Sequence, residues 1–433
     1  MNPPHKESFI IQGLDGQKKL DGEISIEGAK NAILPLIAAA IAVEGISSFT
    51  NVPEIEDVSR MEEILAALGV KAVHRNNAMT IDPSGFTGTR LPRDIAKRMR
   101  ASVFLTGPIL AKKGRVDFPH PGGCVIGARP IDIFVDGFQR MGAAFTENDE
   151  FYSFAAKGRL RGASIFLKIP SVSATETFMI AASLADGRTT IKNSAMEPEI
   201  DVLARYLRSC GANIFGEGSP TIVIEGVESL QSPKEPFNNI PDRIEAGSFL
   251  ILGALAAKNL TLKNVEPKHL EAVIFALQDS GVPISVGDDT ISISDNETPN
   301  NEFKSFNIKT HEYPGFPTDL QAPSVIFLTQ ATGESVIFET IFEGRLNFTE
   351  DIVRMGADIK LWDAHRATVR GPTHLKGREL EGPDIRAGLA FVIAGLIAKG
   401  ESTIRNVYYI DRGYEKIETR LSKLGASIQR VSE

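Results

Sequence analysis

Cysteine is almost absent from this chain of 433 residues, which has only Cys124 and Cys210. Two isolated cysteines supply neither a disulfide framework nor a zinc knuckle. The seven histidines form no HxxxH or HExxH pair, so no metal-binding helix is indicated either. The sequence therefore predicts a protein without a bound metal ion.

Long apolar runs and an excess of positive charge are also missing. The longest apolar run, AILPLIAAAIAV, is far shorter than the roughly 20 residues of a membrane span. The N-terminal stretch MNPPHKESFIIQG has no apolar core of a signal peptide. A net charge of -8 argues against general nucleic-acid binding, which needs clustered Lys and Arg. We expect a cytoplasmic protein with no membrane or nucleic-acid partner.

The standard phosphate-binding motifs are absent as well. No GxxxxGK[ST] loop occurs, and no GxGxxG lies between a strand and a helix. A small anion could still bind, but its site would have to be assembled from several segments.

The chain does contain an internal repeat. Six amphipathic segments each stop at a glycine and run into a β-rich stretch, as a glycine after a helix C-terminus predicts. These glycines recur at intervals of 69 to 75 residues and are Gly69, Gly142, Gly211, Gly281, Gly356 and Gly425. The regular spacing indicates six copies of one unit of about 70 residues.

Each unit also has an earlier, more apolar helix, such as TFMIAASLADG or LAFVIAGLIAKG. A helix that is apolar on nearly all sides must be buried on all sides. We therefore expect two lobes of three βαβαββ units, with buried helices inside and sheets outside, an inside-out α/β barrel. The β-rich runs argue against an α-solenoid.

The lobes are expected at residues 30–238, and at 1–29 together with 239–433. The opening strand, FIIQG, is expected to cross over and pair with the last unit.

Charged residues collect at the starts of the predicted helices. If parallel helices in a lobe point their N-termini the same way, these N-termini converge, and helix N-termini attract anions. Lys30, Arg100 and Arg386 stand at the starts of apolar helices, and Arg129 and Arg412 stand ahead of amphipathic ones. Any single one could be a surface cap or an ion pair, but together they favour an anion-binding cleft.

Two other residues allow two interpretations each. Cys124, in PGGCVIGARPID, is either a reactive thiol near cations or a small residue in a tight turn. Asp319, in YPGFPTDLQAP, is either a placed carboxylate or a helix N-cap. Cys210 lies on an amphipathic helix and is expected to be structural.

Several segments together resemble the enolpyruvyl transferases over the whole chain. They are EGAKNAILP, MRASVFLTGP, PGGCVIGARPID, PDRIEAGSFL, YPGFPTDLQA, DIRAGLAFVIAG and YYIDRGYEKIE. The PGGC loop and GARPID resemble the branch that acts on UDP-N-acetylglucosamine, and are lacking in 5-enolpyruvylshikimate 3-phosphate synthases. The resemblance implies transfer of the enolpyruvyl group of phosphoenolpyruvate to the sugar 3'-hydroxyl, with release of phosphate and with no cofactor.

The resemblance also implies roles for individual residues. Cys124 would protonate phosphoenolpyruvate from a loop that closes over the site, and would be alkylated by fosfomycin. Asp319 would take the hydroxyl proton, and Lys30 would assist catalysis. The residues implied around phosphoenolpyruvate are Lys30, Asn31, Arg129, Arg386 and Arg412. Those implied around the nucleotide sugar are Asn31, Arg100, Arg129, Pro130, Asp132, Ser171, Asp319 and Ile341.

Some positions depart from the family pattern, mostly on the nucleotide-sugar side. They are Phe104, Phe134, Ile169, Ser173, Met196 and Gly344. These changes leave open an enolpyruvyl transferase for another nucleotide acceptor. A non-catalytic paralogue that binds nucleotide sugar is a further alternative, which retention of Cys124 and Asp319 disfavours.

Overall fold

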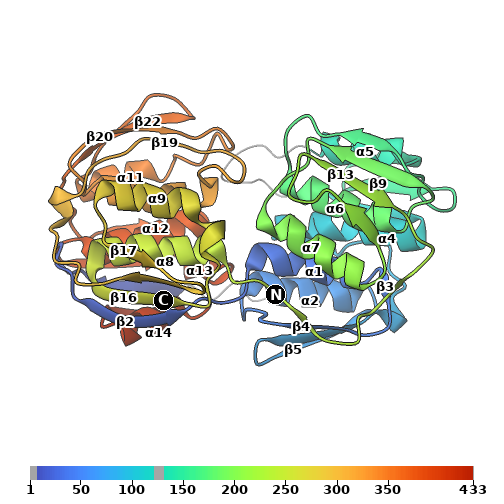
Figure 1. The fold of residues 1–433 in the computed structure, drawn as a ribbon, viewed down its shortest axis with the longest axis horizontal. Helices are drawn as coiled ribbons and strands as arrows, with labels where there is room; N and C mark the ends of the chain where they lie inside the picture. The colour runs from blue at the N-terminus through green and yellow to red at the C-terminus, as the bar shows by residue number, and fades with distance from the viewer. Residues whose placement is uncertain (1–6, 121–130, 433) are drawn as a thin grey trace. The chain divides into compact units, whose positions relative to one another are not determined.

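The computed structural model describes residues 7–120 and 131–432, which form two compact units, here called lobe 1 and lobe 2 (Figure 1). Lobe 1 consists of the described residues between 28 and 240. Lobe 2 consists of residues 7–27 together with 241–432. Each lobe has its own hydrophobic core.

Lobe 1 alternates helices and short strands along the chain. Its helices are α1 (Lys30–Ala40), α2 (Glu56–Ala67), η1 (Pro83–Gly85), α3 (Arg93–Ala96), η2 (Arg100–Leu105), α4 (Thr106–Lys113), α5 (Asp132–Arg140), α6 (Val172–Ser183) and α7 (Pro198–Ser209). Its strands are β3 (Val43–Glu44), β4 (Ser47–Thr50), β5 (Lys71–Arg75), β6 (Ala78–Asp82), β7 (Arg115–Pro119), β8 (Ala143–Glu147), β9 (Phe151–Ala156), β10 (Ser164–Phe166), β11 (Arg188–Lys192), β12 (Asn213–Phe215), β13 (Thr221–Glu225), β14 (Leu230–Gln231) and β15 (Phe237–Asn238).

Lobe 2 follows the same alternation and also takes the two N-terminal strands. Its helices are α8 (Arg243–Ala256), η3 (Pro267–His269), α9 (Glu271–Ser280), η4 (Asn300–Glu302), η5 (Thr318–Leu320), α10 (Gln321–Leu328), α11 (Thr349–Met355), α12 (Ile385–Ile397), α13 (Val407–Asp411) and α14 (Ile417–Lys423). Its strands are β1 (Glu7–Gln12), β2 (Leu20–Ser25), β16 (Ala257–Lys263), β17 (Ile284–Val286), β18 (Thr290–Ile293), β19 (Ile308–Lys309), β20 (Gly333–Phe338), β21 (Asp358–Leu361), β22 (Arg366–Gly371), β23 (Glu379–Glu381), β24 (Glu401–Arg405) and β25 (Ser427–Ser432).

Most sheets share one strand pattern, in which a parallel pair continues into two antiparallel neighbours. The four-stranded sheets have the orders β15-β4-β6-β5, β10-β11-β13-β12, β2-β16-β18-β17, β19-β20-β22-β21 and β23-β24-β1-β25. The sheet β7-β9-β8 has three strands, and its edge is extended by a parallel bridge between Arg90 and Asp117. This repetition matches the expected six-unit α/β architecture.

Segments far apart in the sequence complete three of these sheets. β1 lies between β24 and β25 of the last unit, as expected from the opening strand. β2 pairs in parallel with β16, and β15 pairs in parallel with β4. The N-terminal strands are therefore structural parts of lobe 2 (Figure 1).

Three buried helices form the interior of each lobe. In lobe 2, α8, α10 and α12 contact one another, and in lobe 1, α6 contacts both α1 and α4. Nearly every residue of α8 and α12 is buried, so these helices present apolar side chains on all sides. The six repeated glycines have positive φ and end the amphipathic helices, as predicted.

One expected helix is broken in the structure. The segment SVFLTGPILAKKG begins as the 3₁₀ turn η2 and becomes α-helical only from Thr106. In the last unit the expected amphipathic segment ETRLSK lies in α14, and a separate short helix, α13, precedes it. Pro108 suits the first turn of α4, because its missing N–H needs no helical partner there.

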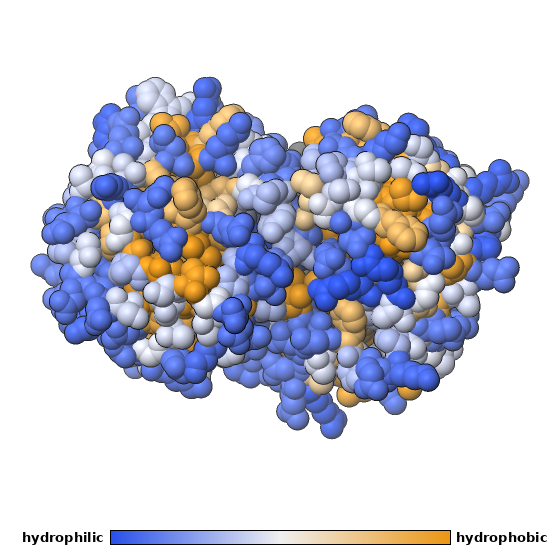
Figure 2. All heavy atoms as spheres, viewed as in Figure 1, coloured by the Kyte–Doolittle hydropathy of each residue, from blue (hydrophilic) through white to orange (hydrophobic). Residues whose placement is uncertain are grey.

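Hydrophobic side chains reach the surface of each lobe in small groups among hydrophilic ones, on the face that Figure 2 shows. The most exposed large ones include Phe275, Phe166 and Trp362. Within the part of the chain that the structure describes, no helix has the length and apolar character needed to cross a membrane.

Candidate functional site

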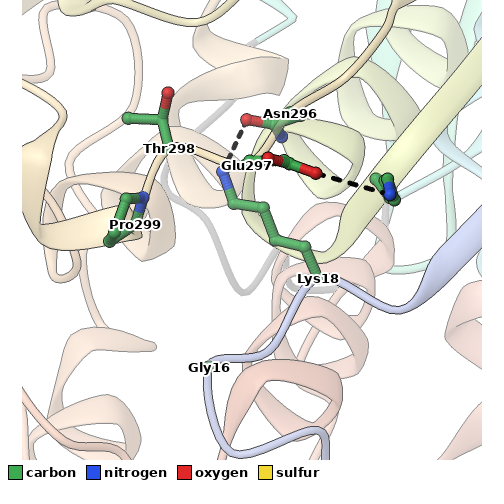
Figure 3. A pocket seen from close by; sticks show the side chains of 7 residues that line it. Gly16, Lys18, Asn296, Glu297, Thr298 and Pro299 are labelled. Atoms are coloured by element: carbon green, nitrogen blue, oxygen red, sulfur yellow. Dashed lines mark hydrogen bonds and ion pairs between the residues drawn. The ribbon is translucent and has the colours of Figure 1, made fainter.

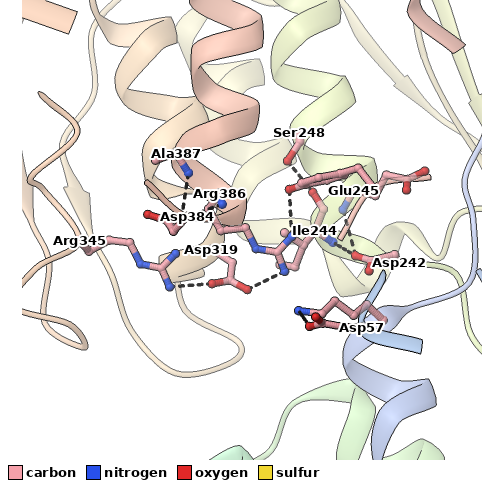
Figure 4. A network of polar contacts seen from close by, with 12 residues as sticks. Asp57, Asp242, Ile244, Glu245, Ser248, Asp319, Arg345, Asp384, Arg386 and Ala387 are labelled. Carbon is pink, nitrogen blue, oxygen red and sulfur yellow. Dashed lines mark hydrogen bonds and ion pairs between the residues drawn. The ribbon is translucent and has the colours of Figure 1, made fainter. Parts of the chain in front are cut away.

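The starts of the buried helices in lobe 2 carry an acidic and basic network (Figure 4). Asp242 caps α8, where its Oδ1 accepts hydrogen bonds from the backbone N–H of Ile244 at 2.8 Å and of Glu245 at 3.0 Å. Asp384 caps α12 in the same way through the N–H of Arg386 at 2.8 Å. Both caps satisfy N–H groups that a helix start leaves unpaired. The Asp384 cap fixes the backbone from which Arg386 projects.

Asp319 lies in η5, directly before α10, and binds two arginines. The Nη2 atom of Arg386 donates to Oδ2 at 2.9 Å, and that of Arg345 donates to Oδ1 at 2.9 Å. Both arginines are 5% exposed. The alternative that Asp319 is a helix N-cap is wrong, because Pro317 and Leu320 hold the cap positions of η5 and α10, neither with a side-chain cap.

The electrostatics keep Arg386 charged. Burial acts to lower the pKa of its guanidinium, but Asp319, Tyr414 and Asp242 together outweigh burial, so that the pKa lies above its ordinary value. The Nη1 atom of Arg386 also donates to the buried Tyr414 hydroxyl at 2.9 Å. A carboxylate beside two fixed cations can accept a proton, and the cations can bind an anion that displaces it.

Glu339 connects the Asp319 turn to the loop that holds Ile341. Its Oε2 accepts a hydrogen bond from the Thr318 hydroxyl at 2.9 Å, and its Oε1 accepts one from the Ile341 N–H at 2.9 Å. Glu339 is completely buried. Neither Glu339 nor Arg345 was among the predicted site residues. Arg345 could have been found from its position ahead of an amphipathic helix, whereas nothing in the sequence marks Glu339.

Arg412 lies at the end of α13, which packs against α12. It is half-buried. Arg412 therefore belongs to lobe 2, together with the predicted site residues Asp319, Ile341 and Arg386.

In lobe 1, Lys30 is the first residue of the buried helix α1 and is itself 8% exposed. Its Nζ lies 3.0 Å from Oδ2 of Asp57, which is in the first turn of α2. The helix starts of the first unit therefore meet at an ion pair. Asn31 follows Lys30 and is half-buried.

The other predicted residues of lobe 1 also stand at helix starts. Arg100 begins η2, and Asp132 begins α5. Ser171 caps α6, where its Oγ accepts a hydrogen bond from the Ala174 N–H at 3.3 Å. Cys124, Arg129 and Pro130 lie outside the described residues. The second cysteine, Cys210, is buried, and burial raises the pKa of its thiol to about 11, which fits the expected structural role.

Two departures from the family pattern are core residues. Phe134 is 4% exposed, and its ring centroid lies 6.1 Å from that of Phe178. Phe104 belongs to the same hydrophobic core. Ile169, by contrast, is 61% exposed. The first two substitutions therefore change packing inside lobe 1.

No three His, Cys, Asp or Glu side chains within residues 7–120 and 131–432 are grouped so that they could hold a metal ion.

Comparisons with known proteins agree with this organisation. The family model of EPSP synthase (3-phosphoshikimate 1-carboxyvinyltransferase) matches residues 14–421. A UDP-N-acetylglucosamine 1-carboxyvinyltransferase of Nostoc sp. is 44% identical over 431 residues, covering 99% of this chain and 95% of the relative. One of Vibrio campbellii is 42% identical over 427 residues, covering 99% of each chain.

Solved structures share the fold at lower identity. The enolpyruvyl transferase NikO from Streptomyces tendae superposes with a TM-score of 0.86 at 24% identity, covering 99% of this chain and 100% of that one. EPSP synthase from Acinetobacter baumannii gives a TM-score of 0.75 at 20% identity, covering 98% and 100%. At these identities the likeness shows the fold alone.

Proposed function

Because the chain belongs to the EPSP synthase family of carboxyvinyltransferases, we propose that it transfers the enolpyruvyl group of phosphoenolpyruvate to the 3'-hydroxyl of UDP-N-acetylglucosamine. The reaction releases phosphate and is the first committed step of peptidoglycan synthesis. The curated relatives named above favour this acceptor over another nucleotide. The proposal includes a cytoplasmic location.

The observation that carries the proposal is the Asp319 carboxylate held between Arg345 and Arg386 at the starts of buried helices. Phosphoenolpyruvate has about three negative charges, and preorganised guanidinium groups with little access to water bind such an anion strongly. An anion that takes hydrogen bonds from Arg386 leaves one Asp319 oxygen free to accept the proton of the attacking hydroxyl. One cluster thus supplies both anion binding and general base catalysis.

The remaining roles follow the family resemblance. In the proposal, Cys124 protonates the methylene carbon of phosphoenolpyruvate while the sugar oxygen bonds to the neighbouring carbon. Lys30, Asn31, Arg129 and Arg412 complete the phosphoenolpyruvate site with Arg386. The nucleotide sugar is held by Asn31, Arg100, Arg129, Pro130, Asp132, Ser171, Asp319 and Ile341. Loss of phosphate and of one proton from the methyl group so formed then restores the double bond in the product.

Phosphate release with both substrates, followed by mass spectrometry of the product, tests the reaction. A nucleotide sugar heavier by one enolpyruvyl group is the expected product. If phosphate is released only with another nucleotide, that nucleotide is the acceptor and UDP-N-acetylglucosamine is not. Binding of UDP-N-acetylglucosamine without any turnover would instead indicate a non-catalytic paralogue.

Two cysteine variants test the acid role. Cys124→Ala should lose at least about 100-fold in turnover, in line with the usual effect of general acid–base groups. The matched variant Cys210→Ala should keep its turnover, because Cys210 is a buried core residue. Fosfomycin should add covalently to the native protein and to Cys210→Ala, but not to Cys124→Ala. Full activity of Cys124→Ala would reject the assigned acid.

A further inference from the structure

The loop between β1 and β2 crosses the C-terminal ends of two buried helices of lobe 2. The Leu14 N–H donates to the Leu396 carbonyl of α12 at 2.7 Å, and the Lys19 N–H donates to the Ala256 carbonyl of α8 at 2.9 Å. Since α8 has 14 residues, it is about 21 Å long. Lys18 on this loop therefore lies at the other end of α8 from its Asp242 cap, away from the candidate site.

Lys18 makes its one described hydrogen bond to an uncharged group. Its Nζ donates to Oδ1 of Asn296 at 2.6 Å and lies 4.3 Å from the ring centroid of Phe303. The Nδ2 atom of Asn296 donates to the carbonyls of Ala254 at 3.1 Å and Ala257 at 3.0 Å at the end of α8. Asn296 is 1% exposed, so this arrangement is part of the folded core.

No carboxylate pairs with Lys18 among the described residues, although two charged side chains lie beside it. Lys258 and Glu297 line the same pocket and pair with each other at 3.4 Å. A lysine at a helix C-terminus is often only a cation placed at the negative end of the helix dipole. Lys18 differs in being half-buried and in lining an open pocket.

The pocket beside Lys18 has a volume of about 300 Å³ and is lined by Gly16, Lys18, Lys258 and residues 296–299 (Figure 3). Burial lowers the pKa of Lys18 to about 7. Near neutral pH a large share of this amine is therefore uncharged and nucleophilic, unlike an ordinary lysine with a pKa of about 10.4.

We propose that Lys18 is a covalent acylation site that reacts as a neutral amine with small acyl phosphates entering this pocket. The lone pair of Nζ attacks the acyl carbon, the bond from that carbon to the phosphate oxygen breaks, and phosphate leaves with the electron pair. The nitrogen then loses a proton to water and becomes a neutral amide. Lys258, which pairs with Glu297 in the structure, supplies a cation for the phosphate group by exchanging that carboxylate for it.

The chain offers an internal control for this proposal. Lys19 is exposed, adjacent in sequence and on the same peptide. The purified protein would be incubated with acetyl phosphate at pH 6 to 9, and unreacted lysines would then be labelled with isotopic acetic anhydride. Cleavage after Glu7 and Glu23 releases residues 8–23, which contain only these two lysines. Fragment-ion mass spectrometry gives the occupancy of each.

Lys18 should be acetylated at least about tenfold faster than Lys19 at pH 7, because far more of it is uncharged. Its rate should level off above about pH 8 while that of Lys19 keeps rising. The preference should vanish in urea. Equal or slower acetylation of Lys18 in the native protein would overturn the proposal, as would a preference that survives unfolding.

Two substitutions at Thr298 test whether Lys18 reacts fast because no carboxylate pairs with it. Thr298→Glu places a carboxylate in the pocket lining and should hold Lys18 in its charged form, so that its rate falls to within about threefold of Lys19. The size-matched Thr298→Gln adds no charge and should keep the preference. Equal rates at Lys18 in these two variants, with melting temperatures that confirm folding, would also overturn the proposal.

Discussion

At Asp319, one carboxylate pairs with two guanidinium groups that are both almost fully buried. A buried ion pair contributes little compared with apolar packing, but removal of one partner leaves an uncompensated charge. This residue therefore links the proposed chemistry to the stability of lobe 2. Arg386 has a second partner in Tyr414, so Asp319 is not its sole support.

Asp319→Asn is expected to lower the free energy of unfolding by about 3 kcal/mol, since Arg345 and Arg386 lose their counter-ion. Its turnover should fall at least about 100-fold with loss of the base. Urea unfolding and initial rates measure the two effects.

The variants Arg345→Gln and Asp319→Asn/Arg345→Gln complete a double-mutant cycle. We expect a coupling of about 1–3 kcal/mol between these contacting residues. Strict additivity of the two stability losses would contradict the ion pair.

At the scale of the element, α6 carries a buried acid in its first turns. Neither carboxyl oxygen of Glu176 has a hydrogen-bond partner among the described residues, and the side chain is fully buried. Burial, followed by the nearby charges of Glu199 and Glu197, raises the pKa of Glu176 well above its ordinary value. The folded state therefore binds a proton at Glu176 that the unfolded state gives up.

Glu176→Gln should stabilise the protein at pH 8 by about 1–3 kcal/mol relative to the parent. The unfolding free energy of the parent falls as pH rises above the unfolded pKa of about 4.5 toward the raised folded pKa. Below that window both states are protonated, and the two proteins should differ little. Urea unfolding at pH 4 and pH 8 measures the difference, with exposed Glu228→Gln as control. A parent–variant difference that is independent of pH would refute the prediction.

The amphipathic helices end at glycines with left-handed backbone, of which Gly211 has φ +100 and open space around its Cα. Gly211→Ala should cost about 1 kcal/mol from backbone strain alone, because no atom would clash with the new Cβ. Gly211→Asn should cost less, since Asn tolerates this region better. Thermal unfolding of both variants tests the order, and an equal or reversed order would point to another cause.

At the scale of the molecule, the two hydrophobic cores are separate, and the N-terminal strands belong to the second. Phe9 in β1 is fully buried in lobe 2, with the Arg430 guanidinium 5.0 Å from its ring centroid. Phe49 in β4 is a buried phenylalanine of the lobe 1 core and is 1% exposed. Trp362, the one tryptophan of the chain, lies in lobe 2.

Phe9→Ala should lower the stability of lobe 2 by about 3–5 kcal/mol and shift the unfolding midpoint followed by Trp362 fluorescence. Phe49→Ala should leave that midpoint nearly unchanged, because each lobe buries its own core. It should instead lower the midpoint of a second transition, the unfolding of lobe 1, followed by circular dichroism. Equal shifts in both variants would mean that the lobes unfold as one cooperative unit.

Local pattern determined most of the fold. Apolar faces, the glycine after each amphipathic helix and the β-rich runs are set by neighbouring residues, so the α/β fold class and the six glycine-terminated helices could be predicted and are confirmed. Charge at the helix starts also follows from local sequence, since a buried helix carries charge only at its ends. For this reason the amino-acid sequence alone was enough to select Lys30, Arg100, Arg386 and Arg412. Their roles remain predictions.

Only the tertiary structure decided which of these groups meet. Asp319 binds arginines 26 and 67 residues further along the chain, and buried Glu339 joins the Asp319 turn to the Ile341 loop. Lys18 lies at the end of α8 because of an asparagine 278 residues away. Such contacts depend on how the repeated units of lobe 2 pack around its three buried helices. A local sequence period does not encode which residues of different units meet. The sequence thus determined the helices, the strands and the charged residues at their ends, and tertiary packing decided which of these residues contact each other.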